Sequence, residues 1–151
     1  MATNATTSDA DRRVALPRQF CLIVGVVLVL AGILGFFYNS TFTSDKSVRD
    51  DVLGILSVNG WHNVVHLATG LVTLALARTA PRQWAGAFGV VYLAVAIWGF
   101  IIGSGDSILS IIPVNTADNV LHLLLGLTGL AVFAASAPAR RPAARSGVAP
   151  A

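Results

Sequence analysis

Four long apolar stretches, separated by short polar segments, dominate the chain. None of them contains Asp, Glu, Lys or Arg. Each is long enough to cross a bilayer as a helix, which takes about 20 mostly apolar residues. Barrel strands are half as long and alternate in polarity, so this pattern excludes a membrane barrel. The sequence therefore predicts four transmembrane helices, at about 20–38, 61–77, 84–103 and 119–137.

Polar residues inside these stretches recur at a fixed spacing. VNGWHNVVHLATG at 58–70 returns as VNTADNVLHLLLG at 114–126, an offset of 56 residues. The first and third stretches share GVV and GF at an offset of 64, so the first copy has eight more residues in its outer loop, around STFTSDKS. Such self-similarity indicates tandem repeats. Because each copy has two spans, both enter the membrane in the same direction, as parallel repeats.

The predicted fold is all-α, a four-helix transmembrane bundle over residues 17–137 made of two tandem, parallel-repeat hairpins at about 20–77 and 84–137. Residues 1–16 and the basic tail at 138–151 are rich in Ala, Ser, Thr, Pro and Arg, and we expect both to be disordered. Two short apolar runs, DVLGILSV and SILSIIPV, precede the second and fourth helices. We expect each to form a helical turn or two at the outer interface.

Composition and charge fit a membrane protein and predict its orientation. Of the 151 residues, 55% are hydrophobic and 11% are charged, which is far from a soluble composition. Arginines precede the first helix, lie between the second and third, and follow the fourth. The positive-inside rule then predicts a multi-pass plasma-membrane protein with both termini in the cytoplasm. The net charge of +3 reflects this topology rather than nucleic-acid binding. The expected partner is the lipid bilayer, with a second copy or another membrane protein as further candidates.

The helical period places the recurring polar residues and glycines on one face of the second helix and one face of the fourth. These residues are Asn59, Asn63, His66 and Gly70 in the first copy, and Asn115, Asn119, His122, Gly126 and Gly129 in the second. Facing lipid, the amides and imidazoles would lack partners, so we expect the two faces to meet inside the bundle. His66 lies close to the outer boundary, so the cluster is expected to be accessible from outside.

The simplest interpretation is hydrogen bonding between helices, with Gly70, Gly126 and Gly129 allowing close packing, in a non-enzymatic structural or binding protein. A second interpretation is a transition-metal site, since imidazole and carboxylate groups are common ligands. Its four candidate ligands are His62, His66, Asp118 and His122. A third is a b-type haem held by His66 and His122, with Gly70 and Gly126 leaving room for the macrocycle.

A fourth interpretation is a small proton-linked transporter in which His66, His122 and Asp118 relay protons, because ionisable groups at membrane depth are often functional. No complete proton path is visible in the sequence, since the inner halves of the predicted helices contain no acidic residue. No recognisable catalytic motif or phosphate-binding loop is present either. The sequence names no catalytic residue and favours a function other than catalysis.

The paired segments at 58–70 and 114–126, each after a short apolar run containing LG or LS, resemble a family of small four-span bacterial membrane proteins of unknown function that is common in actinobacteria. The resemblance covers about residues 18–137. It implies a four-helix membrane fold. It implies no activity and assigns no catalytic residue, because the family has no established one.

Overall fold

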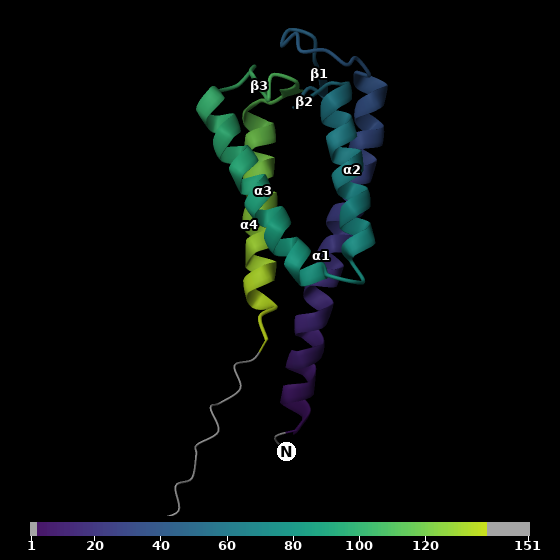
Figure 1. Ribbon diagram of the computed structural model, residues 1–151, viewed down its shortest axis with the longest axis vertical. Coiled ribbons are helices and arrows are strands. Elements are labelled where there is room, and N and C mark those ends of the chain that lie inside the picture. The colour runs from purple at the N-terminus through teal and green to yellow at the C-terminus, as the bar shows by residue number, and fades with distance from the viewer. Residues whose placement is uncertain (1–2, 139–151) are drawn as a thin grey trace, which may run out of the picture.

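The chain folds into four helices and two small β-hairpins in the computed structural model, which describes residues 3–138 (Figure 1). The helices are α1 (Thr3–Tyr38), α2 (Gly60–Leu76), α3 (Pro81–Ile102) and α4 (Thr116–Ala135). The strands are β1 (Asp50–Val52), β2 (Leu56–Val58), β3 (Ser107–Ile108) and β4 (Ile112–Pro113). The architecture is an all-α bundle, as predicted.

Three helices are long and apolar enough to cross a membrane: α1 from Asp11 onward, α3 and α4. α2 has 17 residues, which is at the short end of the range for a membrane span. Large apolar side chains are exposed along all four helices, as expected where lipid replaces water as the solvent. These features indicate a membrane protein.

α1 is longer than the sequence indicated. It begins at Thr3, although the composition of residues 1–16 predicts disorder. Ala and Arg favour helix, and extending an existing helix needs no new nucleus, so the apolar span can continue toward the N-terminus. Pro17 lies inside α1 and does not end it. The predicted disorder at 138–151 falls, apart from its first residue, outside the described residues.

α1 packs along α2, and α3 packs along α4, through glycines at corresponding positions. A Cβ at Gly70 would lie 2.7 Å from the backbone nitrogen of Val29. A Cβ at Gly126 would lie 2.7 Å from the backbone nitrogen of Leu93. The helices in each pair therefore approach so closely that only glycine fits at these points. The two contacts correspond: Gly70 and Gly126 are separated by the sequence offset of 56, and Val29 and Leu93 by the offset of 64.

The two short apolar runs form β-hairpins, so the expectation of helical turns was wrong. β1 pairs antiparallel with β2, and β3 pairs antiparallel with β4. The turns use positive φ angles at Leu53 (54°), Gly54 (70°), Leu109 (52°) and Ser110 (62°). Consecutive positive φ angles reverse the chain tightly. Leu and Ser rarely adopt this conformation, and the second turn therefore carries no sequence signal.

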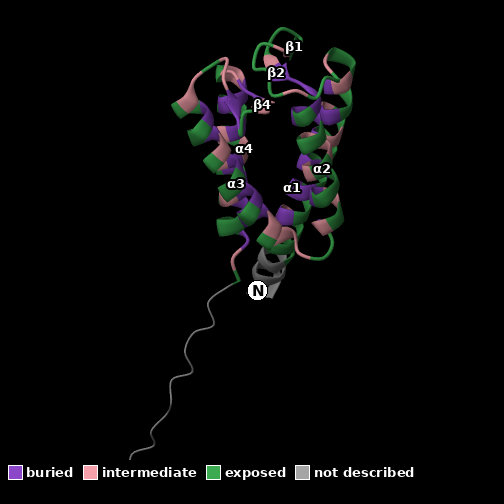
Figure 2. Ribbon diagram, turned by 45° about the horizontal axis from the view of Figure 1, so that its top comes forward, coloured by how far each residue is buried: buried purple, intermediate pink, exposed green. Residues whose placement is uncertain are grey.

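The two helix pairs meet at both ends of the bundle. Away from the β-hairpins they share an apolar core, where Phe20 and Phe88 meet edge to face with ring centroids 5.6 Å apart. Figure 2 shows buried positions on the helix sides that face other helices and exposed positions on the outside. At the hairpin end the pairs are joined by side-chain hydrogen bonds, described below. The candidate site lies between these two regions.

Candidate metal centre between the helix pairs

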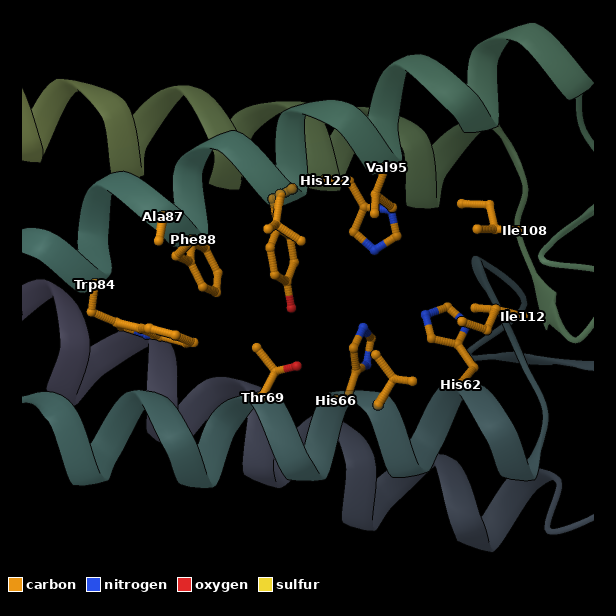
Figure 3. A pocket seen from close by; sticks show the side chains of 13 residues that line it. His62, His66, Thr69, Trp84, Ala87, Phe88, Val95, Ile108, Ile112 and His122 are labelled. Carbon is orange, nitrogen blue, oxygen red and sulfur yellow. The ribbon is translucent and has the colours of Figure 1, made fainter.

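Three histidines from the two helix pairs meet in one group, the histidine cluster (His62, His66 and His122). His62 and His66 lie one turn apart on α2, and His122 lies on α4. The ring centroids of His62 and His66 are 4.4 Å apart. The ring centroid of His122 is 6.1 Å from that of His62 and 6.3 Å from that of His66. One ligand nitrogen from each ring lies within 4.8 Å of the other two, and Figure 3 shows the rings around a common space.

The hydrogen bonding of His62 fixes which of its nitrogens faces that space. Nδ1 of His62 lies 2.8 Å from the carbonyl oxygen of Ser57. A carbonyl oxygen only accepts, so Nδ1 carries the proton and donates it, and in the neutral ring Nε2 keeps a free lone pair. Metal-binding histidines commonly have this arrangement, with one nitrogen held by a backbone carbonyl and the other free for the ion. The chain thus orients His62 as a metal ligand would be oriented.

The other two histidines have no comparable partner in the part of the chain that the structure describes. Among the described residues, no side-chain hydrogen bond is formed by the imidazole of His66. Nδ1 of His122 is buried and has no hydrogen-bond partner, although the residue is only 5% exposed. An unpaired buried polar atom costs about 1–3 kcal/mol. Oδ1 of Asn63 and Oδ1 of Asn119 are unpaired in the same way, so it is the convergence with His62 and His66 that makes His122 a candidate ligand.

A cavity of about 200 Å³ extends from the histidine cluster along the space between α2 and α3. Besides the histidines it is lined by Val65, Thr69, Trp84, Ala87, Phe88, Val91, Tyr92, Val95, Ile108 and Ile112. The end away from the histidines is bounded by Trp84 (Figure 3), whose Nε1 donates a 2.9 Å hydrogen bond to Oγ1 of Thr73 on α2. The walls are apolar except for the imidazoles and two hydroxyl groups.

The end of the cavity nearest the β-hairpins is covered, whereas the sequence led us to expect an accessible cluster. Ile108 and Ile112, from β3 and β4, lie beside His62 (Figure 3). Ile108 is 4% exposed and His62 only 1%. The β-hairpins, which the sequence did not predict, therefore cover the histidine cluster at this end of the bundle.

The segment between α1 and β1 is longer than the segment between α3 and β3 and adds contacts at the hairpin end of the bundle. The Arg49 guanidinium donates a 2.7 Å hydrogen bond to the carbonyl oxygen of Gly105, and Lys46 forms an ion pair with Asp106. The hydrogen bond from Lys46 lowers the pKa of the Asp106 carboxyl below its usual value. Because the pair is exposed, it contributes little to stability. It does connect the outer loops of the two helix pairs.

Asn59 and Asn115 cap helices and join the two pairs, and neither lies in the histidine cluster. Each is the N-cap of its helix, accepting a hydrogen bond from the backbone three residues later. Each also donates across the bundle, Asn59 to the carbonyl of Ile111 at 2.8 Å and Asn115 to that of Ile55 at 2.7 Å. These two bonds are reciprocal under the offset of 56. Asn followed by a helix is a cap signal, and the sequence could have shown this role.

Asn63 and Asn119 face the partner helix of their own pair, away from the histidines. Nδ2 of Asn63 donates a 2.7 Å hydrogen bond to the carbonyl of Asn39 at the end of α1. A Cβ at Gly35 would lie within 2.0 Å of Oδ1 of Asn63, and a Cβ at Gly99 within 1.9 Å of Oδ1 of Asn119. The residues of each predicted polar face therefore point in different directions: the histidines lie between the helix pairs, whereas Asn63 and Asn119 lie within a pair.

Asp118 does not join the histidine cluster, although the sequence suggested it as a fourth ligand. One oxygen of its carboxylate accepts 3.0 Å hydrogen bonds from the backbone nitrogens of Ser57 and Asn115. With Asn115 it forms a capping box at the start of α4. The carboxylate therefore ties α4 to β2 in place of facing the cluster.

Gly129, like Gly70 and Gly126, lies against a neighbouring helix backbone. A Cβ at Gly129 would be 2.8 Å from the carbonyl oxygen of Ala85. All three glycines act within a helix pair. None of them faces the other pair, where a haem between His66 and His122 would need room.

Tyr92 and Trp84 belong to the site and were missed by the sequence reasoning. The Tyr92 ring lies edge-on to His122 with centroids 5.5 Å apart and stacks on Phe88 at 4.0 Å. Tyr92 is one of only two tyrosines in the chain and lies in the middle of an apolar span. A hydroxyl at that depth was the available signal.

The comparisons with known proteins place the chain in a family without assigning it an activity. No curated protein and no solved structure matches the chain. The model of one family, described as a domain of unknown function (DUF4383), matches residues 18–135. These residues include all four apolar stretches, both β-hairpins and the histidine cluster. The chain therefore belongs to the DUF4383 family.

Proposed function

We propose that this protein is a membrane protein that binds one transition-metal ion through His62, His66 and His122. The observation that carries the proposal is the convergence of three ligand nitrogens within 4.8 Å of one another in an otherwise apolar cavity. Three neutral imidazoles suit Zn²⁺, Cu²⁺ and related ions. Three protein ligands leave one tetrahedral position open, the arrangement of metal sites that exchange a ligand.

The hydrogen bonds of the other polar residues support this assignment. Packing and capping account for Asn59, Asn115 and Asp118 without any ligand. The same explanation does not cover His122, because its buried Nδ1 has no partner among the described residues. Hydrogen bonding between helices, the simplest interpretation of the sequence, therefore explains Asn59 and Asn115 better than it explains the histidines.

The other two interpretations fit the geometry less well. The cavity of about 200 Å³ is below the ~300–1,000 Å³ of pockets for drug-sized ligands, and a haem is at least as large as such ligands. His62 also lies beside both candidate axial ligands. No acidic residue of the described chain lines the cavity, which leaves a proton-linked transporter without a relay.

We also propose four membrane spans, with α2 as the fourth, and both termini in the cytoplasm of a bacterial plasma membrane. The Arg distribution supports this orientation. We further infer that the two helix pairs descend from one duplicated hairpin. Corresponding glycine contacts and reciprocal asparagine bonds support that inference. The histidine cluster then lies on the outer side of the membrane, beneath the β-hairpins.

Metal analysis of the purified protein tests the proposal. The protein is stripped with a chelator, incubated with Zn²⁺ or Cu²⁺ and analysed by mass spectrometry for bound metal. We expect one ion per chain. His62→Ala, His66→Ala and His122→Ala should each weaken binding at least about tenfold, because each removes one of three ligands.

Asn63→Ala is the matched control. Asn63 is the neighbour of His62 in sequence and is fully buried, but its side chain faces α1. It should lower the thermal stability and leave one ion bound. Metal binding that survives all three histidine substitutions would show that the cluster is not the site.

A further inference from the structure

The cavity is polar at one end and apolar along its length. The three imidazoles lie at the end near the β-hairpins, and Trp84 lies at the other (Figure 3). Between them the walls are formed mainly by valine, alanine and phenylalanine side chains. A space of this shape matches a molecule with a small polar head and an apolar body. A simple inorganic ligand for the metal would leave the apolar part without an occupant.

The exposed residues that line the cavity all belong to α2 and α3: they are Val65, Ala87 and Val91. These two helices contact each other far less than each contacts its own partner. Val65 on α2 and Val91 on α3 both line the cavity, and they are 41% and 56% exposed. In a membrane protein such exposed apolar side chains within a helix face lipid. The cavity therefore opens sideways, toward the bilayer.

The route from water is closed at the same time. Ile108 and Ile112 cover the histidines on the outer side, and the reciprocal bonds of Asn59 and Asn115 hold the two β-hairpins in place. A ligand that arrives through the solution would have to displace this cover. A ligand dissolved in the membrane would not.

We propose that the open coordination position of the metal takes a membrane-dissolved amphiphile with an oxygen-bearing head, which enters between α2 and α3. Its oxygen, from a hydroxyl, phenol or carbonyl group, lies at the metal, and its apolar body lies along the cavity toward Trp84. The Tyr92 hydroxyl is available as a hydrogen-bonding group in the cavity wall. This inference rests on the proposed metal site for the contact with the head.

Cobalt(II) provides the test, because its visible absorption changes when its ligands change. The protein in phosphatidylcholine nanodiscs is loaded with Co²⁺ and titrated with 4-hexylphenol, or with azide as a water-soluble ligand. We expect 4-hexylphenol to change the Co²⁺ spectrum with saturation and azide to change it weakly and slowly.

A matched pair of variants tests the route. Val91 lines the cavity, and its neighbour Val90 does not, yet the two are similarly exposed, at 56% and 59%. Val91→Phe should weaken the response to 4-hexylphenol about tenfold by filling the opening, while Val90→Phe should change it less than about twofold. Unchanged Co²⁺ content in both variants shows that the site is intact.

The possible failures are distinguishable. If the wild type holds no Co²⁺ that depends on the three histidines, the metal site is wrong and this inference falls with it. If Co²⁺ is held but 4-hexylphenol has no effect, or the two valine variants behave alike, the metal site stands and the membrane route is wrong. A rapid, full response to azide alone overturns the route in the same way.

Discussion

At the scale of single residues, the structure gives different roles to positions that the sequence offset of 56 relates. His62 and Asp118 are related by the offset of 56, and both bond to the backbone of Ser57, His62 to its carbonyl and Asp118 to its N–H. One oxygen of the carboxylate accepts from the backbone of Ser57 and Asn115, and Asp118 does not lie in the histidine cluster. The imidazole of His62 keeps one nitrogen for the cavity. The proposed metal site therefore includes the imidazole of His62 and does not include the carboxylate of Asp118.

Asp118→Asn separates the ligand set suggested by the sequence from the one found in the structure. We expect bound metal to stay at one ion per chain, with affinity changed less than about twofold. Thermal stability should fall by about 1–2 kcal/mol, because charge-assisted hydrogen bonds to Ser57 and Asn115 become neutral ones. Metal analysis and thermal unfolding in detergent check both parts. A large loss of metal would make Asp118 a ligand after all.

Gly99→Ala should destabilise the α3–α4 pair. The new Cβ would lie within 1.9 Å of Oδ1 of Asn119, and such overpacking costs about 1–3 kcal/mol. Asn119→Ala removes the side chain that the new Cβ would meet. Gly99→Ala should therefore cost less stability in an Asn119→Ala background than in the wild type, as expected for residues in contact. Thermal unfolding of the four proteins measures this coupling. Additive effects would contradict the contact.

At the scale of elements, the β-hairpins and helix caps work as one unit that joins the helix pairs. The N-cap side chains of α2 and α4 each accept from their own helix and donate to the opposite hairpin. Each N-cap bond is a local interaction, so the sequence alone can predict it. The donation across the bundle depends on where the other hairpin lies, and no local pattern reports that.

Asn115→Asp tests the two uses of one side chain separately. Aspartate still caps α4, because its carboxylate accepts from the backbone of Asp118 as the amide does. It cannot donate to the carbonyl of Ile55, and it places a second charge near Asp118. We expect stability to fall by about 1–3 kcal/mol, while Asn115→Ser, a good cap without an amide donor, should lose less. Equal stability of Asn115→Asp and wild type would mean that the bond across the bundle contributes nothing.

Ser110→Gly should stabilise the protein. Ser110 has a φ angle of +62°, which costs a residue with a Cβ about 1 kcal/mol that glycine avoids. Part of this gain is lost because glycine makes the unfolded chain more flexible, which favours the unfolded state. The expected net gain in stability is therefore about 0.5 kcal/mol. The reverse change in the other hairpin, Gly54→Ala at φ +70°, should destabilise by a similar amount. Thermal unfolding of both variants gives the two signs.

At the scale of the whole molecule, orientation in the membrane determines what the cavity can receive. Cysteines at Ser44, in the outer loop, and at Thr79, between α2 and α3, are both exposed. In a Cys21→Ala background, an impermeant thiol reagent added to intact cells should label Ser44→Cys and leave Thr79→Cys unlabelled until the cells are opened. Cys21 is fully buried, so its removal changes little at the surface. The opposite labelling pattern would invert the proposed topology.

The sequence alone determined the all-α class, the approximate helix positions and the three histidines, because apolar length and helical period are local properties. The tertiary structure decided which of these groups meet. His122 lies near His62 and His66 only because the two helix pairs are joined at both ends. Asp118 instead accepts a hydrogen bond from the backbone of Ser57, a residue 61 positions away. The hairpin cover and the sideways cavity depend on turn angles at Leu109 and Ser110 and on side chains from three elements. Such contacts follow from packing between distant segments, which no periodicity along the chain encodes.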